Sequence, residues 1–354
     1  MTPAGYLPPL RVQLPGDRRF TWYSPAGRAP TEYEDLTVHQ QSSPLHYAFQ
    51  GWPVRFDDGR DPYDDGTTAV RSSDWYAFRD PNRTIQRTYV SSTNESEKGL
   101  DRSIAGARGA GLLEFADPGW VSEVLASHFL TYPFIDYGLF LALCYAEREA
   151  LSDTITFSIV FTAADKLRSL QDTVFYSFDL AEALPGFAEA DVHQIWKSDP
   201  IWQGARRVVE QIVASDDWME VVIATNLCFD RLFGELVRVG FFSRFAAANG
   251  DVVTPLLIAS SESDTARTLR WTKALVTHVL DDARHGQRNR DLIQGWVQRW
   301  SAAAVDAAEA FAPLFDTPKV KPSTFDSALA QVRLKQSAVL DELGLGQAAV
   351  GTPG

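Results

Sequence analysis

The chain has 354 residues, of which 45% are hydrophobic, 12% aromatic and 22% charged. This composition suits one large or two modest hydrophobic cores and excludes wholesale disorder. A net charge of −13 argues against binding nucleic acid or an anionic membrane, because both are polyanions. The chain has only two cysteines, Cys144 and Cys228, and this count excludes a disulfide framework. Both have apolar neighbours, which predicts buried free thiols in a reducing cytoplasm.

Residues 1–110 are predicted to form an extended arm. Prolines recur along this segment, and each one fixes φ and removes a backbone donor, so it suits neither a helix bundle nor a central sheet. Its first residues lack the basic start and apolar run of a signal peptide. Many aromatic side chains distinguish it from a disordered tail. We expect the arm to lie on a partner; packing on its own helical domain is the alternative.

Residues 111–345 are predicted to form an all-α domain, followed by a flexible tail at 346–354. Apolar residues recur at spacings of three and four, and breakers separate the stretches. Asp117 and Asp217 are expected to cap helices. The predicted helices span 118–150, 153–175, 187–214, 217–247, 252–281, 282–312 and 323–343. Long helices with short connections pack antiparallel, so we expect a ferritin-like helix bundle.

The most hydrophobic stretch runs from Val124 to Ala146. Pro133 and Asp136 interrupt it, so it falls short of the roughly 18 uncharged residues that a membrane span needs. We expect a buried core helix in a soluble protein.

Two segments of the helical domain share the pattern Asp-x-x-Arg: residues 165–169 (Asp-Lys-Leu-Arg-Ser) and 281–285 (Asp-Asp-Ala-Arg-His). In ferritin-like di-iron proteins each iron takes ligands from a Glu-x-x-His pair, because residues three apart share one helix face. The two segments resemble the Asp-Glu-x-Arg-His signature of the catalytic subunits of soluble multicomponent di-iron monooxygenases.

Set against that signature, both segments are degenerate. In the first, Lys166 stands in the place of Glu and Ser169 in the place of His. In the second, Asp282 and His285 keep a shortened version of the pair. A charged lysine has no free lone pair and serine is a poor iron ligand, so the first half-site is lost. The resemblance therefore predicts a bundle that binds no di-iron centre.

The carboxylates of such a bundle still need positive charge. Lys166, Arg168 and Arg284 are expected to supply it as internal ion pairs, which are costly unless fully bonded. Two readings of the second segment stay open. His285 is either a hydrogen-bonded helical side chain or, with Asp282 and Glu235, the ligand of a stray single metal.

The arm carries a sharper resemblance. Residues 78–90 contain Phe-Arg-Asp-Pro, then Thr84, then Arg-Thr-Tyr-Val. This stretch resembles the small (β) subunits of toluene, phenol, methane and propane monooxygenase hydroxylases. Aromatic and arginine side chains often anchor interfaces, so we expect a partner interface, although residues 79–82 alone also suit an ordinary turn. The candidate interface residues are Trp22, Tyr33, Trp75, Tyr76, Phe78, Arg79, Asp80, Arg87 and Tyr89.

The resemblance implies a non-catalytic small subunit with no cofactor of its own. Its partner would be a large (α) subunit carrying the di-iron centre, in an α2β2 assembly with or without a γ subunit. A reductase with FAD and a 2Fe-2S cluster would supply electrons from NADH, and a coupling protein would dock. Propane, tetrahydrofuran or an aromatic is the implied kind of substrate. A free-standing ferritin-like regulatory protein and an active ferritin-like oxidase are the alternatives.

Overall fold

The computed structural model describes residues 25–38, 65–184 and 190–346, and the single positions 23, 40, 59 and 187. These residues form helices joined by turns, without a strand, so the all-α prediction is confirmed for this part of the chain. Trp22, most of the first 64 residues of the predicted arm and most of the predicted tail lie outside the described residues.

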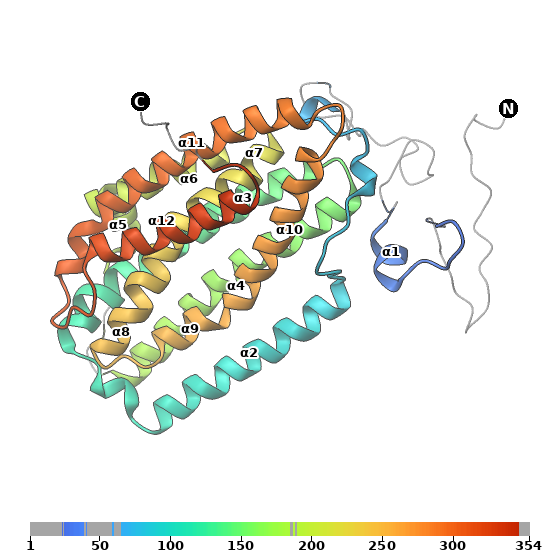
Figure 1. Ribbon diagram of the computed structural model, residues 1–354. Helices are drawn as coiled ribbons and strands as arrows, with labels where there is room; N and C mark the ends of the chain where they lie inside the picture. Colours follow the sequence, from blue (N-terminus) through green and yellow to red (C-terminus); the bar gives the residue numbers. More distant parts are fainter. Residues whose placement is uncertain are drawn as a thin grey trace, which may run out of the picture.

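Long helices packed side by side form the body of the molecule (Figure 1). They are α3 (Pro133–Glu149), α4 (Asp153–Ala183), α6 (Pro200–Val213), α10 (Glu262–Leu280), α11 (Gly286–Phe311) and α12 (Phe325–Glu342). Another long helix runs from α7 (Trp218–Ile223) through two π-helical segments, η6 (Ala224–Gly234) and η7 (Leu236–Ser243), into α8 (Arg244–Ala248). α3 pairs with α4, and α11 packs on α6 and η6. The predicted bundle is therefore confirmed.

Two predicted helices are broken in the structure. Residues 187–214 form α5 (Val192–Ser198) and α6, because Pro200 has no N–H to continue α5 and Asp199 caps the new start with a 2.9 Å bond from the backbone N–H of Ile201. Residues 252–281 likewise form α9 (Thr254–Ser260) and α10.

The core is dominated by aromatic and branched aliphatic side chains. Phe241, Phe242, Phe311 and Phe315 are buried, and their rings meet mostly edge to face or tilted. The helix over Trp120–Glu149 is long and apolar enough to cross a membrane, but 61% of its most apolar window is buried inside the molecule. It is therefore a core helix, as the interrupted hydrophobic stretch predicts.

The prediction of an extended arm is wrong for residues 86–109. They form α2 (Gln86–Gly109), a 24-residue helix on the outside of the bundle (Figure 1). Serine, threonine and glycine are frequent along it, and its buried residues are Leu100, Ile104 and Ala107. With so few apolar positions, the helical period is hard to read from sequence. A further short helix, α1 (Glu32–Thr37), begins at a capping box made by Thr31 and Glu34.

The segment that precedes α2 is bound to the bundle through its backbone. The N–H groups of every second residue from 69 to 73 donate to side chains of the helical domain, as the alternation of an extended chain allows. The pairs are Ala69 with Asp217 (2.6 Å), Arg71 with Asn289 (3.0 Å) and Ser73 with Asp282 (2.5 Å). We call residues 69–73 the clamped segment. It packs on its own chain, which was the alternative to partner contact.

Candidate functional site

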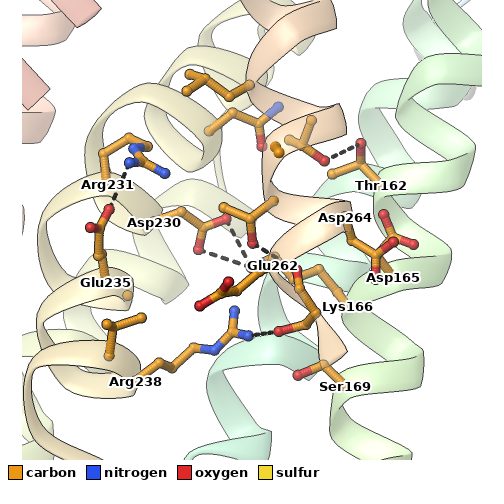
Figure 2. Close-up of a pocket in the computed structure, with 18 of the residues that line it drawn as sticks. Thr162, Asp165, Lys166, Ser169, Asp230, Arg231, Glu235, Arg238, Glu262 and Asp264 are labelled. Carbon is orange, nitrogen blue, oxygen red and sulfur yellow. Dashed lines mark hydrogen bonds and ion pairs between the residues drawn. The ribbon is translucent and has the colours of Figure 1, made fainter. Parts of the chain in front are cut away.

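Helices α3, α4, η6, η7 and α10 surround a cavity of about 330 Å³ at the centre of the bundle (Figure 2). Charged side chains line it from several directions. Lys166 and Ser169, the two positions that the sequence placed in a lost half-site, both line this cavity. The structure therefore brings the first degenerate half-site to the bundle centre, as predicted.

Lys166 is the buried cation of this cavity. Its Nζ lies 2.8 Å from one carboxylate oxygen of Asp230 and 3.5 Å from a carboxylate oxygen of Asp136. Burial lowers the pKa of Lys166, but Asp230 and Asp136 raise it by more, so the net pKa lies above its ordinary value. Lys166 is thus a charged ammonium group held between two carboxylates, on a helix and at a position where the family signature has a metal-binding glutamate.

A pair of matching motifs joins α4 to α10. Arg168 donates to Asp264, and Arg267 donates to Asp165 at 2.5 Å and to Asp264 at 3.0 Å. Residues 165–168 and 264–267 both read Asp-x-x-Arg, so each arginine binds the aspartate of the opposite motif. Such charge-assisted bonds are strong where solvent is excluded.

This geometry corrects the second half-site. The partner of residues 165–169 is residues 264–268, where Thr265 stands in the place of Glu and Thr268 in the place of His. Neither half-site therefore has Glu and His at these positions, whereas the sequence predicted a shortened Asp and His pair in the second. The segment chosen from the sequence, residues 281–285, has the same Asp-x-x-Arg pattern and a histidine, but it follows the C-terminal end of α10.

Asp282 and His285 lie in the turn between α10 and α11, outside the cavity. Asp282 accepts bonds from the backbone N–H groups of Ser73, Arg284 and His285. Burial opposes its ionisation, but these donors more than offset it and hold the pKa of Asp282 well below its usual range. Arg284 is exposed rather than part of an internal ion pair. Of the two readings left open for this segment, the hydrogen bonds of Asp282 favour the one without a metal, and Asp282 holds the clamped segment.

Further charged side chains of the cavity also have partners. Glu235, one of the candidate metal ligands, forms an ion pair with Arg231 at 2.6 Å and another with Lys335. Arg238 extends from η7 and donates to the hydroxyl of Ser261 (Figure 2). Six carboxylates line the cavity, and six cations lie in or beside it. The carboxylates are Asp136, Asp165, Asp230, Glu235, Glu262 and Asp264, and the cations are Lys166, Arg168, Arg231, Arg238, Arg267 and Lys335.

These side chains do not fit a di-iron centre. Iron needs carboxylates and imidazoles with free lone pairs. Among the described residues that line the cavity none is a histidine or cysteine, and the carboxylates that face Lys166 and the arginines are already bonded. The donor set therefore suits internal ion pairs, as the sequence predicted from Lys166 and Arg168.

The same network reaches α2. Arg168 also contacts Glu97 of α2 and Asp172 of α4, each at 3.2 Å. Burial and the nearby Glu97 raise the pKa of Asp172 to about 7. On the other side, the hydroxyl of Tyr89 donates to Asp165 at 2.9 Å. Charges at the bundle centre therefore help to hold α2 in place.

Five of the candidate interface residues contact this chain instead of solvent. Tyr33, Trp75, Phe78 and Asp80 are buried, and Tyr89 is half-buried. Trp75 packs edge to face on Trp218, Phe78 on His278, and Tyr89 stacks on Phe161. Tyr33 accepts a bond from the backbone N–H of Asp80, whose carboxylate in turn binds the N–H groups of Asn82 and Thr84.

The other candidate interface residues are more exposed or lie outside the described residues. Arg79 is half-buried and donates to the carbonyl oxygens of Tyr76 and Phe78. Tyr76 and Arg87 are exposed, and Arg87 pairs with Glu32 at 2.6 Å. Trp22 lies outside the described residues. Partner contact by the arm stays a prediction, now resting mainly on Tyr76 and Arg87.

Sequence reasoning missed several residues of the cavity. Asp230, Arg231 and Arg238 lie on the π-helical segments, whose wider winding changes which side chains face inward. Asp264 and Arg267 carried a readable signal, since their Asp-x-x-Arg pattern repeats that of Asp165 and Arg168. Only the packing of α10 against α4 singles it out from the pattern at 281–284.

Comparison with known proteins gives a consistent result. The family model described as methane/phenol/alkene hydroxylase matches residues 52–283. The small subunit of the propane 2-monooxygenase hydroxylase component of Mycolicibacterium goodii is 33% identical over 330 residues, covering 93% of this chain and 89% of that protein. The β chain of methane monooxygenase component A from Methylosinus trichosporium is 32% identical, covering 90% and 83%.

A solved structure supports the fold independently. A phenol hydroxylase chain from Pseudomonas sp. OX1 superposes with a TM-score of 0.76 at 21% identity, covering 90% of this chain and 91% of that chain. At this level of identity the likeness concerns the fold alone. It agrees with the helix bundle described above.

Proposed function

The chain belongs to the methane/phenol/alkene hydroxylase family, as the small subunit of a multicomponent monooxygenase hydroxylase, and from this premise we propose that it is a non-catalytic, structural subunit. It would stabilise the assembly without binding iron. The chain would thus share its fold with iron-bearing bundles without sharing their chemistry.

The position of Lys166 carries this proposal. An ammonium group 2.8 Å from Asp230 and 3.5 Å from Asp136 takes up the negative charge that a metal would otherwise balance. The crossed pairs of Arg168 with Asp264 and Arg267 with Asp165 do the same for these two aspartates. A cation placed among these side chains would meet positive charge and bonded oxygens, both of which oppose metal binding.

The ion pairs also explain how the bundle stays folded without iron. Buried charges are strongly destabilising when one partner is missing, but acceptable when each has an opposite charge and hydrogen bonds. At the bundle centre, opposite charges from α3, α4, η6 and α10 lie within ion-pair distance of one another. The subunit can therefore present a rigid helical surface while the chemistry takes place elsewhere.

The partners and cofactors follow from the same premise. The di-iron centre would lie in a large (α) subunit, in an α2β2 assembly with or without a γ subunit. A reductase with FAD and a 2Fe-2S cluster would pass electrons from NADH, and a coupling protein would complete the cytoplasmic system. A small hydrocarbon such as propane, or an aromatic, is the class of substrate, since relatives are named for propane, methane, toluene and phenol.

Reconstitution of the hydroxylase tests this function. The cognate large subunit is co-expressed with and without this chain, and NADH-dependent oxidation of propane and toluene is measured with reductase and coupling protein present. We expect activity only with both subunits. A Ser169→Ala chain, altered at the former histidine position, should support the same kcat within about twofold, because no transition-state interaction is removed.

Two results would refute the proposal. Full activity of the large subunit without this chain would remove its structural role. A large loss of kcat with Ser169→Ala in an intact complex would mean that the cavity takes part in the reaction. Thermal unfolding of the variant chain provides the control, since Ser169 is only half-buried and its loss should leave the fold intact.

A further inference from the structure

The outward face of α4 carries a regular stripe of uncharged side chains. Its positions are separated by alternating steps of three and four residues, which is the heptad spacing that brings one helix against another. The stripe consists of Phe157, Val160, Ala164, Leu167, Gln171, Val174 and Phe178. Six of the seven are apolar. The first four are half-buried, whereas Val174 is 38% and Phe178 62% exposed.

The inward face of the same helix carries the charges. Asp165, Lys166 and Arg168 are buried at the bundle centre, and Asp172 is half-buried beside them. A helix on the surface of a free-standing protein has the opposite arrangement, with apolar residues inside and charged residues outside. Around residues 165–172 the charges of α4 therefore face inward, whereas elsewhere its buried side chains include the apolar Ile159, Tyr176 and Leu180.

The neighbouring helix extends the apolar surface. α3 and α4 pack against each other. On α3, Tyr137 and Leu141 are 48% and 42% exposed, and Cys144 is half-buried at the next position of the same helical face. We group these residues with the α4 stripe as the α3–α4 face, because the two helices pack against each other.

We propose that the α3–α4 face is the docking surface for the large subunit of the hydroxylase, which would place an uncharged, apolar helix or helix pair against it. This inference rests on the proposed function. An exposed apolar surface of this kind is typical of obligate interfaces. The stripe spacing further specifies a nearly parallel or antiparallel helix crossing, rather than a loop or a steep crossing.

Charge favours the large subunit over a second copy of this chain. Each copy has a net charge of −13, so two copies meeting on an uncharged face repel each other without ion pairs to offset the repulsion. The curated relatives are small subunits of a hydroxylase component, so a larger partner belongs to their assembly. A partner that is less acidic and apolar at its contact surface satisfies both observations.

Charge substitutions on the exposed part of the stripe test the proposal. A Val174→Glu/Phe178→Glu chain is co-expressed with the tagged cognate large subunit. The amount recovered per large subunit should fall at least about tenfold, because carboxylates become buried in an apolar interface. Leu334→Glu on α12 is the matched control, since Leu334 is 72% exposed outside this face. It should assemble like the unaltered chain.

Thiol reactivity gives a second readout without any substitution. Cys144 is half-buried on the α3–α4 face, whereas Cys228 is fully buried and serves as an internal control. A maleimide should label Cys144 of the isolated chain, and assembly with the large subunit should slow this labelling at least about tenfold by removing solvent access. Mass spectrometry of the two cysteine peptides measures both rates.

The outcomes separate this inference from the proposed function. Failure of the unaltered chain to assemble with the large subunit would refute the proposed function. Normal assembly of the double variant, or unchanged Cys144 labelling in the complex, would refute only the α3–α4 face. A dimer of the isolated chain that the double variant disrupts would assign the face to a second copy. Equal resistance of Cys144 and Cys228 in the isolated chain would mean that the chain covers the face itself.

Discussion

The two faces of α4 differ around residues 165–172, where one carries buried charges and the other is uncharged. The inward face carries Asp165, Lys166 and Arg168, whose charges are satisfied inside the chain. The outward face is uncharged and leaves Phe178 and Val174 exposed. Under the two proposals above, the inward charges replace a metal and the outward stripe docks on a partner.

Under the proposed function, the inward face balances the carboxylates of a bundle that holds no metal. Removing two irons leaves negative charge that must be balanced. Here the balance comes from Lys166 and from crossed arginine–aspartate pairs between α4 and α10. The cavity is thus polar, and five of its six carboxylates lie within ion-pair distance of a cation.

The largest expected effect comes from removing the central cation. Lys166→Met leaves Asp136 and Asp230 without their ammonium partner, and losing one member of a buried pair costs about 3–5 kcal/mol. Denaturant unfolding at pH 7 measures the change in the free energy of unfolding. The matched control, Lys335→Met, removes a 57%-exposed partner of Glu235 and should cost less than about 1 kcal/mol. Equal costs would show that the centre does not depend on Lys166.

A smaller loss is expected where the clamped segment meets the bundle. The buried Asn289 side chain binds both the N–H and the C=O of Arg71 and also the carbonyl of Val279. Asn289→Ala should cost about 2 kcal/mol, since it leaves buried backbone groups unpaired. Gln287→Ala, at an exposed side chain of the same helix, is the control. Faster hydrogen exchange at residues 69–73 should accompany the loss, and unchanged exchange there would contradict the clamp.

The smallest expected effect is a pH dependence at Asp172. Its pKa is raised to about 7, so the folded chain binds a proton there that the unfolded chain releases near pH 4. Stability from this group is therefore present at low pH and lost as the pH rises from about 4 to about 7. Asp172→Asn should be more stable than the unaltered chain at pH 8, with no difference below pH 4. Thermal melts across this range measure it, and a constant difference would exclude the assignment.

The position of a half-site could be predicted from sequence where the residues of one helix identify it, but not where the packing of two helices does. Lys166 and Ser169 were placed correctly at the bundle centre because the signature lies within one helix. The second half-site was misplaced because Asp264 and Asp281 both begin an Asp-x-x-Arg pattern, and only the packing of α10 on α4 distinguishes them. Because residues 281–285 include His285, they match the Asp-Glu-x-Arg-His signature more closely than residues 264–268 do.

The prediction of an extended arm at residues 1–110 was partly wrong for a different reason. Its aromatic residues predicted a contact surface, and Trp75 and Phe78 do make contacts, but with this chain's own Trp218 and His278. Composition shows that a side chain will be buried without showing against what. α2 was missed because only Leu100, Ile104 and Ala107 of its 24 residues are buried, too few to reveal a helical period.

Iron analysis of the isolated chain tests the central claim most directly. The chain is produced in iron-supplemented cells, treated with a mild chelator and measured by elemental analysis, beside the large subunit treated in the same way. The ion pairs around Lys166 predict less than about 0.1 iron per chain for this subunit, while the large subunit retains its di-iron centre. Stoichiometric iron that survives chelation, and that Lys166→Met alters, would contradict the account.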